Sequence, residues 1–174
     1  MRHRGPDGEG SFFEDQVFLG HRRLSILDLS ELGAQPMASA DGRYVIVYNG
    51  ELYNSPEIRR ELAAAGVSMR SRCDTEVLLE AIALWGIEQV RRFNGIFAFA
   101  LWDRRERELT LCRDHFGVKP LYVCDIPGGV AFASESSALR SLVPDLDLSI
   151  DPRRAIQLLT FGWIPEPHTM TPAI

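Results

Sequence analysis

Asn49 and Gly50 are a pair of residues that could stabilise a negatively charged oxygen. They follow Tyr44–Tyr48, an apolar run typical of a buried strand. An amide side chain beside the N–H of a glycine can form an oxyanion hole, because glycine lets a reacting carbonyl group approach closely, and Glu51 adds an acid next to it. Taken alone, Asn-Gly more often marks a hairpin turn. Here the chain continues directly into a helix start at Ser55, so no return strand is expected.

Asp74 and Arg23 could hold the charged groups of an amino acid. Asp74 opens a helical pattern and is well placed as its N-cap, and a capping carboxylate keeps a lone pair that can accept from an ammonium group. Arg23 carries a forked guanidinium that could bind a carboxylate with two hydrogen bonds, although a surface salt bridge is the simpler interpretation of one arginine. The residues alone therefore indicate a candidate amino-acid site.

Short strands and punctuated helices must position these residues. Closely spaced apolar segments separated by turn residues predict antiparallel hairpins. The predicted strands are Val17–Leu19, Tyr44–Tyr48, Phe97–Trp102, Glu108–Cys112, Leu121–Cys124 and Val130–Ala133. The predicted helices run from Ser55 to Gly66, from Asp74 to Trp85 before Gly86, and from Asp151 through Leu159. Strands outnumber helices, which favours an α+β fold with antiparallel sheet covered by helices.

Composition and charge argue against several classes of function. The 174 residues are 45% hydrophobic and 25% charged, with a net charge of -5 and no basic stripe of the kind that binds nucleic acid. No apolar run approaches the ~20 residues of a membrane span. The three cysteines, Cys73, Cys112 and Cys124, lack CxxC spacing, so reduced thiols in a cytoplasmic protein are expected. The four histidines form no i,i+4 pair and predict no metal site.

Motifs along the whole chain resemble those of the glutamine-hydrolysing asparagine synthetases. In family order they are Arg2–Asp7 (RHRGPD), His21–Asp28 (HRRLSILD), Ala34–Met37 (AQPM), Tyr48–Asn54 (YNGELYN), Cys73–Val77 (CDTEV), Phe97–Asp103 (FAFALWD), Arg113–Tyr122 (RDHFGVKPLY) and Phe161–His168 (FGWIPEPH). So many motifs at family-like spacing make chance agreement negligible. The resemblance implies a class II glutamine amidotransferase domain over residues 1–174, with the N-terminal-nucleophile hydrolase fold of two stacked antiparallel sheets between helix layers.

The resemblance also assigns roles to individual residues. Such a domain hydrolyses glutamine to glutamate, and the ammonia passes to a synthetase domain that uses ATP and Mg to amidate aspartate. Carried over by position, Glu51 and Asp74 receive the α-ammonium group of glutamine, and Asn49 and Gly50 form the oxyanion hole. Arg23 binds the α-carboxylate of glutamine. The backbone that lines the pocket is implied to be that of Leu24, Ser25, Ile26 and Leu27.

Two parts of the family pattern, the nucleophilic cysteine and the synthetase domain, are not found in these residues. The family's nucleophile is a cysteine at the mature amino terminus, with its own α-amine as the base, on a first strand expected before Arg2–Asp7. Residues 160–174, proline-rich after Trp163, are expected to form an extended segment leading toward the synthetase domain. We therefore expect the chain as given to bind glutamine without hydrolysing it, and to use no cofactor of its own.

Two alternatives remain open from the sequence. A non-catalytic glutamine-binding or scaffolding module would keep the same pocket residues. An amidotransferase domain of this type can also serve a different ammonia acceptor, such as a sugar. In either case a domain without its first strand would expose a sheet edge, which favours self-association or a homodimer.

Overall fold

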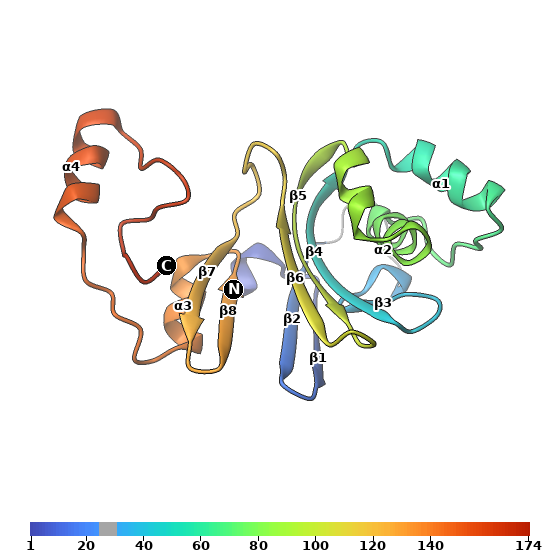
Figure 1. Ribbon diagram of the computed structural model, residues 1–174, viewed down its shortest axis with the longest axis horizontal. Helices are drawn as coiled ribbons and strands as arrows, with labels where there is room; N and C mark the ends of the chain where they lie inside the picture. Colours follow the sequence, from blue (N-terminus) through green and yellow to red (C-terminus); the bar gives the residue numbers. More distant parts are fainter. Residues whose placement is uncertain (25–30) are drawn as a thin grey trace. The chain divides into compact units, whose positions relative to one another are not determined.

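The computed structural model describes residues 1–24 and 31–174. The chain divides into two compact units, Met1–Lys119 and Pro120–Ile174, which are described separately. The ribbon in Figure 1 shows the elements of both units in the colours of the sequence. All the residues to which the sequence analysis gave a role in a site belong to the first unit.

The first unit contains a two-stranded ribbon, a four-stranded sheet and two main helices. The ribbon pairs β1 (Gly8–Glu14) with β2 (Val17–Arg23), and the sheet has the antiparallel order β3-β4-β5-β6. Its strands are β3 (Met37–Ala38), β4 (Tyr44–Leu52), β5 (Gly95–Asp103) and β6 (Glu108–Arg113), and the helices are α1 (Ser55–Ala64) and α2 (Asp74–Trp85). The described residues of the unit also form three 3-10 turns: η1 (Arg2–Arg4), η2 (Glu31–Gly33) and η3 (Ile87–Arg92).

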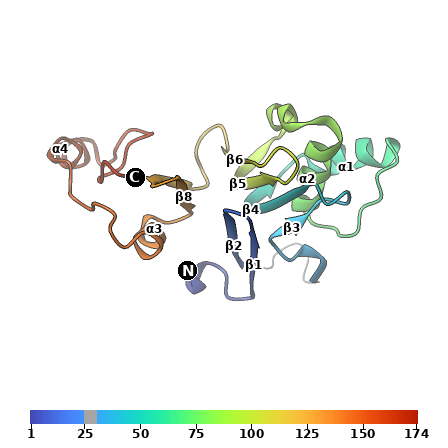
Figure 2. The same cartoon turned by 60° about the horizontal axis from the view of Figure 1, so that its bottom comes forward.

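Strand β4 is buried on both faces, which explains its continuous apolar sequence. One face of the strand packs against α1 and α2, which both lie on that side of the sheet (Figure 1). Its residues Tyr44, Ile46 and Tyr48 belong to a core shared with the two helices. Val45 and Val47, which alternate to the opposite face, are also buried. The turned view in Figure 2 shows the β1–β2 ribbon as a separate pair of strands below β4.

The course of β4 corrects the strand end predicted from the sequence. The strand does not stop at Tyr48: Asn49 pairs with Ala98 and Gly50 with Phe97, and pairing continues to Leu52. The hairpin-turn interpretation of Asn-Gly is therefore also wrong. Nine consecutive pairs with β5 outweigh the turn preference of these two residues. A Cβ on Gly50 would lie 2.6 Å from Cα of Phe97, so glycine is needed here for the close approach of β5.

Several elements of the structure were not predicted from the sequence. Strand β2 continues four residues past Leu19, and its partner β1 was not predicted because its glycines and acidic residues have low strand propensity. The short β3 and the helix α3 (Ser136–Leu142) were also missed. The hairpin of β5 and β6 and the helix α2 are confirmed. Helix α1 is confirmed as well, although it ends at Ala64.

The second unit contains one hairpin and two helices. Strands β7 (Tyr122–Ile126) and β8 (Gly129–Ala133) pair as predicted. Helix α4 (Pro152–Phe161) begins after Asp151, whose side chain accepts from the N–H of Arg153 at 2.8 Å. It ends at Gly162, which adopts a left-handed φ of 75°. The helix therefore includes the first two residues of the predicted extended segment 160–174, and the stretch without helix or strand begins at Gly162.

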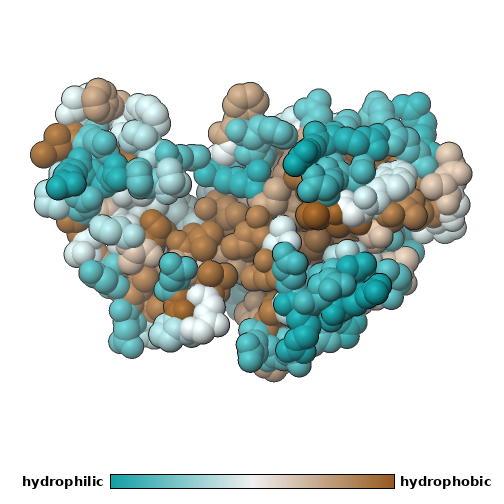
Figure 3. All heavy atoms as spheres, in the orientation of Figure 1, coloured by the Kyte–Doolittle hydropathy of each residue, from teal (hydrophilic) through white to brown (hydrophobic). Residues whose placement is uncertain are grey.

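Hydrophobic side chains remain on parts of the surface, drawn in brown in Figure 3. In the first unit, Phe13 and Phe18 are cross-strand partners of the ribbon and are both mostly exposed. In the second, Leu159 and Trp163 are exposed in and after α4. None of the helices among the described residues is long and apolar enough to cross a membrane.

Candidate amino-acid site

The carboxylate of Asp74 attaches the start of α2 to strand β4. Its Oδ2 atom accepts hydrogen bonds from the hydroxyl of Tyr48 at 3.0 Å and from the backbone N–H of Leu52 at 2.8 Å. Asp74 is 7% exposed, and Cys73 is the N-cap of the helix. The prediction that Asp74 is the cap is therefore wrong, because its carboxylate binds β4 instead of its own helix. These two bonds place Asp74 beside the segment that contains Asn49, Gly50 and Glu51.

The hydroxyl of Tyr48 is held in its protonated form. Burial, reinforced by the charge of Asp74 and their hydrogen bond, raises the pKa of Tyr48 above its usual range. Tyr48 therefore remains a hydrogen-bond donor to Asp74 at all physiological pH values.

Glu51 lies in the negative potential of Asp74. Burial raises the pKa of Glu51, and the charge of Asp74 raises it further, whereas Lys119 partly opposes both. Two carboxylates that disfavour each other's charge are stabilised by a cation that contacts both. The structure therefore brings together the two acids expected to receive an ammonium group.

Arg23 ends strand β2, and the RHRGPD segment packs against its backbone. The N–H of Asp7 donates to the carbonyl of Arg23 at 3.0 Å, and a Cβ on Gly5 would lie 2.6 Å from the nitrogen of Arg23. Leu24 follows the strand and is exposed. The predicted pocket residues Ser25, Ile26 and Leu27 lie outside the described residues.

His21 is a residue near the site that sequence reasoning gave no role of its own. Burial lowers the pKa of its imidazole, a hydrogen bond with the backbone of Tyr48 opposes that shift, and the charge of Arg23 adds to the lowering. Its Nδ1 atom is buried and has no hydrogen-bond partner among residues 1–24 and 31–174. One face of β2 carries every second residue, which here are Leu19, His21 and Arg23. This face is turned toward β4, because His21 forms its hydrogen bond with the backbone of Tyr48 in that strand.

Asp114 organises the loop of the RDHFGVKP motif, and its role was also missed. Its carboxylate accepts from the backbone N–H groups of Phe97, Phe116, Val118 and Lys119 at 2.9–3.1 Å. Burial opposes the effect of these bonds, but together they lower the pKa of Asp114. The signal that could have found it is an aspartate three residues before a glycine, since Asp side chains bind the backbone N–H groups of such turns.

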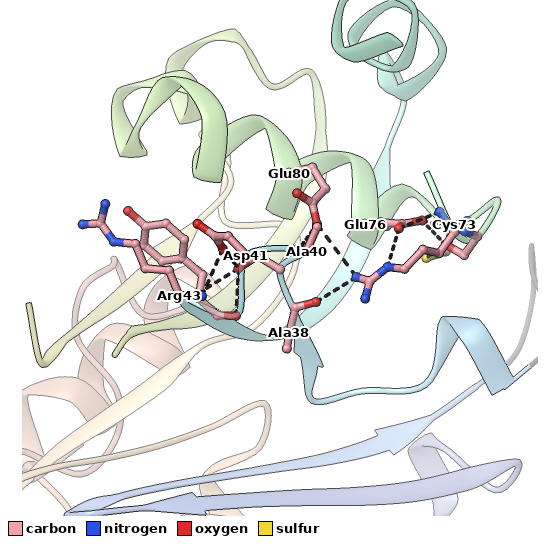
Figure 4. Close-up of polar contacts among 11 residues, drawn as sticks. Ala38, Ala40, Asp41, Arg43, Cys73, Glu76 and Glu80 are labelled. Carbon is pink, nitrogen blue, oxygen red and sulfur yellow. Dashed lines mark hydrogen bonds and ion pairs between the residues drawn. The ribbon is translucent and has the colours of Figure 1, made fainter. Parts of the chain in front are cut away.

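Buried acids of α2 bind the backbone of two neighbouring segments, as Figure 4 shows for Glu76 and Glu80. Glu76 accepts four hydrogen bonds, from the backbone N–H and Nε of Arg70 and from the N–H and hydroxyl of Ser71, at 2.6–3.1 Å. Glu80 accepts from the N–H of Ala40 at 2.7 Å. These bonds hold the chain before Asp74 and the turn after β3 against the same helix.

The three cysteines have the surroundings of structural thiols. All are free, and burial raises the pKa of Cys73, Cys112 and Cys124. A raised pKa disfavours the thiolate, which is the nucleophilic form. Cys73 precedes Asp74, and its Sγ contacts the hydroxyl of Ser71 at 2.9 Å. Within the described part of the chain, no cluster of three or more His, Cys, Asp or Glu side chains could hold a metal ion.

Comparison with known proteins identifies the family to which the chain belongs. A family model described as a glutamine amidotransferase domain matches residues 1–174. The chain belongs to this glutamine amidotransferase family. It is 42% identical over 168 residues to glutamine-hydrolyzing asparagine synthetase 1 of Bacillus subtilis, which covers 97% of the chain and 26% of that relative. It is 39% identical over 140 residues to glutamine-hydrolyzing asparagine synthetase B of Escherichia coli, which covers 80% of the chain and 25% of that relative.

The fold of this glutamine amidotransferase domain is also found in a solved structure. Glutamine phosphoribosylpyrophosphate amidotransferase from B. subtilis, complexed with ADP and GMP, matches with a TM-score of 0.59 and 24% identity, over 69% of the chain and 28% of that protein. The predicted α+β fold of the N-terminal-nucleophile hydrolase type is thereby confirmed. The chain spans about a quarter of the length of the curated relatives described above.

Proposed function

We propose that residues 1–174 are the glutamine-hydrolysing part of an asparagine synthetase, which releases ammonia from glutamine for the ATP-dependent amidation of aspartate by a synthetase region. The observation that carries this proposal is the position of Asp74. Its bonds to Tyr48 and Leu52 hold it against the segment that contains Asn49, Gly50 and Glu51. The domain family and the curated relatives support the same proposal.

Each group of glutamine has a partner of matching chemistry in this proposal. Glu51 and Asp74 bind the α-ammonium group, because the pKa of Glu51 is raised by burial and by the charge of Asp74, and a cation relieves both effects. Arg23 binds the α-carboxylate with its planar fork. The amide of Asn49 and the N–H of Gly50 donate to the oxygen of the side-chain carboxamide as it becomes negatively charged.

The nucleophile of the proposed reaction is a cysteine on a strand that precedes residue 1. Its α-amine takes the proton of the thiol, and the thiolate attacks the carboxamide carbon. The C–N bond breaks as the resulting α-ammonium gives that proton to the leaving nitrogen, so that ammonia leaves. Water then cleaves the thioester to give glutamate and the free thiol. The pKa values of Cys73, Cys112 and Cys124 are raised by burial, which makes these thiols unsuited to this step.

Adding the cysteine-bearing strand is expected to switch on glutaminase activity. We define the extended protein as this chain preceded by the family's cysteine-bearing first strand and followed by its synthetase region. Ammonia release should be measured for residues 1–174, for the extended protein, and for the extended protein with its first cysteine changed to serine. We expect activity from the extended protein only. Ammonia release by residues 1–174 that Asn49→Ala abolishes would contradict the assignment of the nucleophile, and an inactive extended protein would contradict the proposed function.

Arg23→Lys in the extended protein tests how the α-carboxylate of glutamine is bound. Lysine keeps the positive charge but loses the forked shape of the guanidinium group. Glutamine should therefore bind more weakly by about 1.5–3 kcal/mol, the size of a hydrogen bond to a charged group. Isothermal titration with the cysteine-to-serine form measures this affinity without turnover. Arg22→Lys is the matched control, because Arg22 forms an ion pair with Glu9 at 2.5 Å on the same ribbon. An unchanged affinity in Arg23→Lys would show that Arg23 does not bind glutamine.

A further inference from the structure

Gln35 connects strand β4 to helix α2 immediately beside the proposed site. Its Oε1 atom accepts a hydrogen bond from the backbone N–H of Tyr48 at 2.6 Å, and its Nε2 atom donates to the hydroxyl of Thr75 at 3.3 Å. Tyr48 is the residue before Asn49, and Thr75 is the residue after Asp74. One side-chain amide therefore joins the neighbours of the oxyanion donor and of the ammonium ligand.

The backbone of Gln35 is fixed against the β1–β2 ribbon. A Cβ on Gly10 of β1 would collide with the carbonyl oxygen of Gln35 and would lie 3.2 Å from Cδ of Pro36. Gly10 is directly opposite His21 in the ribbon, two residues from Arg23. Gln35 is thus in contact with β4, with α2, and with β1, the strand that pairs with β2.

Tyr48 provides a second connection between the same elements. Its N–H donates to Gln35, its hydroxyl donates to Asp74 at 3.0 Å, and its backbone forms a hydrogen bond with His21. Because Asp74 and Thr75 are consecutive, the bonds from Tyr48 and Gln35 both hold the first turn of α2 at a set distance from β4. We call the chain of bonds from Tyr48 through Gln35 to Thr75 the Gln35 bridge.

We infer that Gln35 is a positioning residue that sets the separation between Asn49 and Asp74, and so aligns the two ends of bound glutamine. The inference rests on the proposed function. The ammonium and carboxamide groups of glutamine are joined by a short carbon chain, so their partners must be correctly spaced, and a displacement of about 1 Å can cost ~100-fold in rate. A glutamine residue at position 35 suits the bridge, because its side-chain amide offers both an acceptor for Tyr48 and a donor for Thr75.

Gln35→Met in the extended protein removes both bonds and keeps the length of the side chain. We expect kcat/KM for glutamine to fall by ~10- to 100-fold, with changes in both kcat and KM because both ends of the substrate are misaligned. Gln35→Glu should recover most of the loss, since its carboxylate can accept from the N–H of Tyr48 and from the hydroxyl of Thr75. If Gln35→Met does not fold, Thr75→Val measures the same connection from α2, with a smaller loss in kcat/KM.

Asn54→Ala is the matched control for stability. Asn54 is also a side-chain amide with two hydrogen bonds, to the carbonyl of Arg92 at 2.9 Å and from the N–H of Asn94 at 3.0 Å, and the proposal gives it no contact with glutamine. The unfolding temperature of Asn54→Ala should fall by about as much as that of Gln35→Met, because both variants lose two hydrogen bonds. The kcat/KM of Asn54→Ala should stay within about twofold of wild type. Equal kcat/KM in Gln35→Met and wild type, or equal losses in the two variants, would overturn the inference. A wild-type extended protein that releases no ammonia would instead overturn the proposed function.

Combining Gln35→Met with Tyr48→Phe tests whether the two connections act on one spacing. Tyr48→Phe removes only the hydroxyl bond to Asp74 and leaves the N–H that donates to Gln35. If both bonds set the position of the first turn of α2, the loss in kcat/KM of the double variant should differ from the product of the single losses by at least about threefold. Strictly multiplicative losses would show that Gln35 acts independently of Asp74, which contradicts the inference.

Discussion

Replacing Asn49 by alanine in the extended protein is expected to lower kcat for glutamine hydrolysis by about a hundredfold or more, because one donor to an oxyanion is worth roughly that much. Asn49 lies within β4 and pairs with Ala98 through its backbone. Its side-chain amide makes no hydrogen bond to another residue in the described part of the chain, so its removal should leave the strand intact. The affinity for glutamine should change little, because the negative charge on the oxygen develops only in the transition state.

Asn49→Asp is the matched variant for this prediction. Aspartate has nearly the same shape but offers no N–H group when ionised, so it should be at least as inactive as alanine. Ammonia release under single-turnover conditions separates the chemical step from binding, and circular dichroism checks that the fold is kept. A variant that loses glutamine binding but turns over bound glutamine at the normal rate would show that Asn49 is a binding contact and not an oxyanion donor.

The ends of α2 and the β5–β6 hairpin could be predicted from the sequence, because each depends on residues that are close together in the chain. The start of α2 at Asp74 and its end before Gly86 follow from residues within one turn of each boundary, and the β5–β6 hairpin follows from its turn residues. The extension of β4 through Asn49 and Gly50 could not be predicted, because it depends on pairing with β5. That strand lies more than 40 residues later in the chain. Strand pairing overrode the turn preference of these two residues.

The residues of the candidate site could be proposed from the sequence, whereas the side chains that support them could not. Arg23, Asn49, Glu51 and Asp74 were singled out by residue type, and the structure joins the last three through the bonds of Asp74 to β4. The role of Gln35 was not foreseen, because its partners Tyr48 and Thr75 lie 13 and 40 residues away and no periodic pattern connects them. Side chains that hold backbone groups across a fold leave no signal in the local sequence.

Asp74→Asn in the extended protein is expected to raise the KM for glutamine by ~10- to 100-fold while changing kcat much less. Asparagine can keep an acceptor oxygen for Tyr48 and Leu52, so the attachment of α2 to β4 should survive, whereas the negative charge that faces the ammonium group is lost. A hydrogen bond to a charged group contributes about 1.5–3 kcal/mol, and each 1.4 kcal/mol is tenfold in affinity. Asp74→Ala would not separate these effects, because it also leaves two buried donors without an acceptor.

The same substitution should change how glutamine binding depends on pH. Burial and the charge of Asp74 both raise the pKa of Glu51, so in the wild type Glu51 becomes protonated, and stops attracting the ammonium group, at a higher pH than an ordinary glutamate. Removing the charge of Asp74 leaves only burial to raise this pKa. The rise of KM on acidification should therefore begin at a lower pH in Asp74→Asn than in the wild type, from a KM that is already higher at neutral pH. Titration of KM from pH 8 to pH 4, with unfolding measured at each pH, tests this. An unchanged KM at neutral pH, together with a loss of unfolding free energy, would show that Asp74 only attaches α2 to β4.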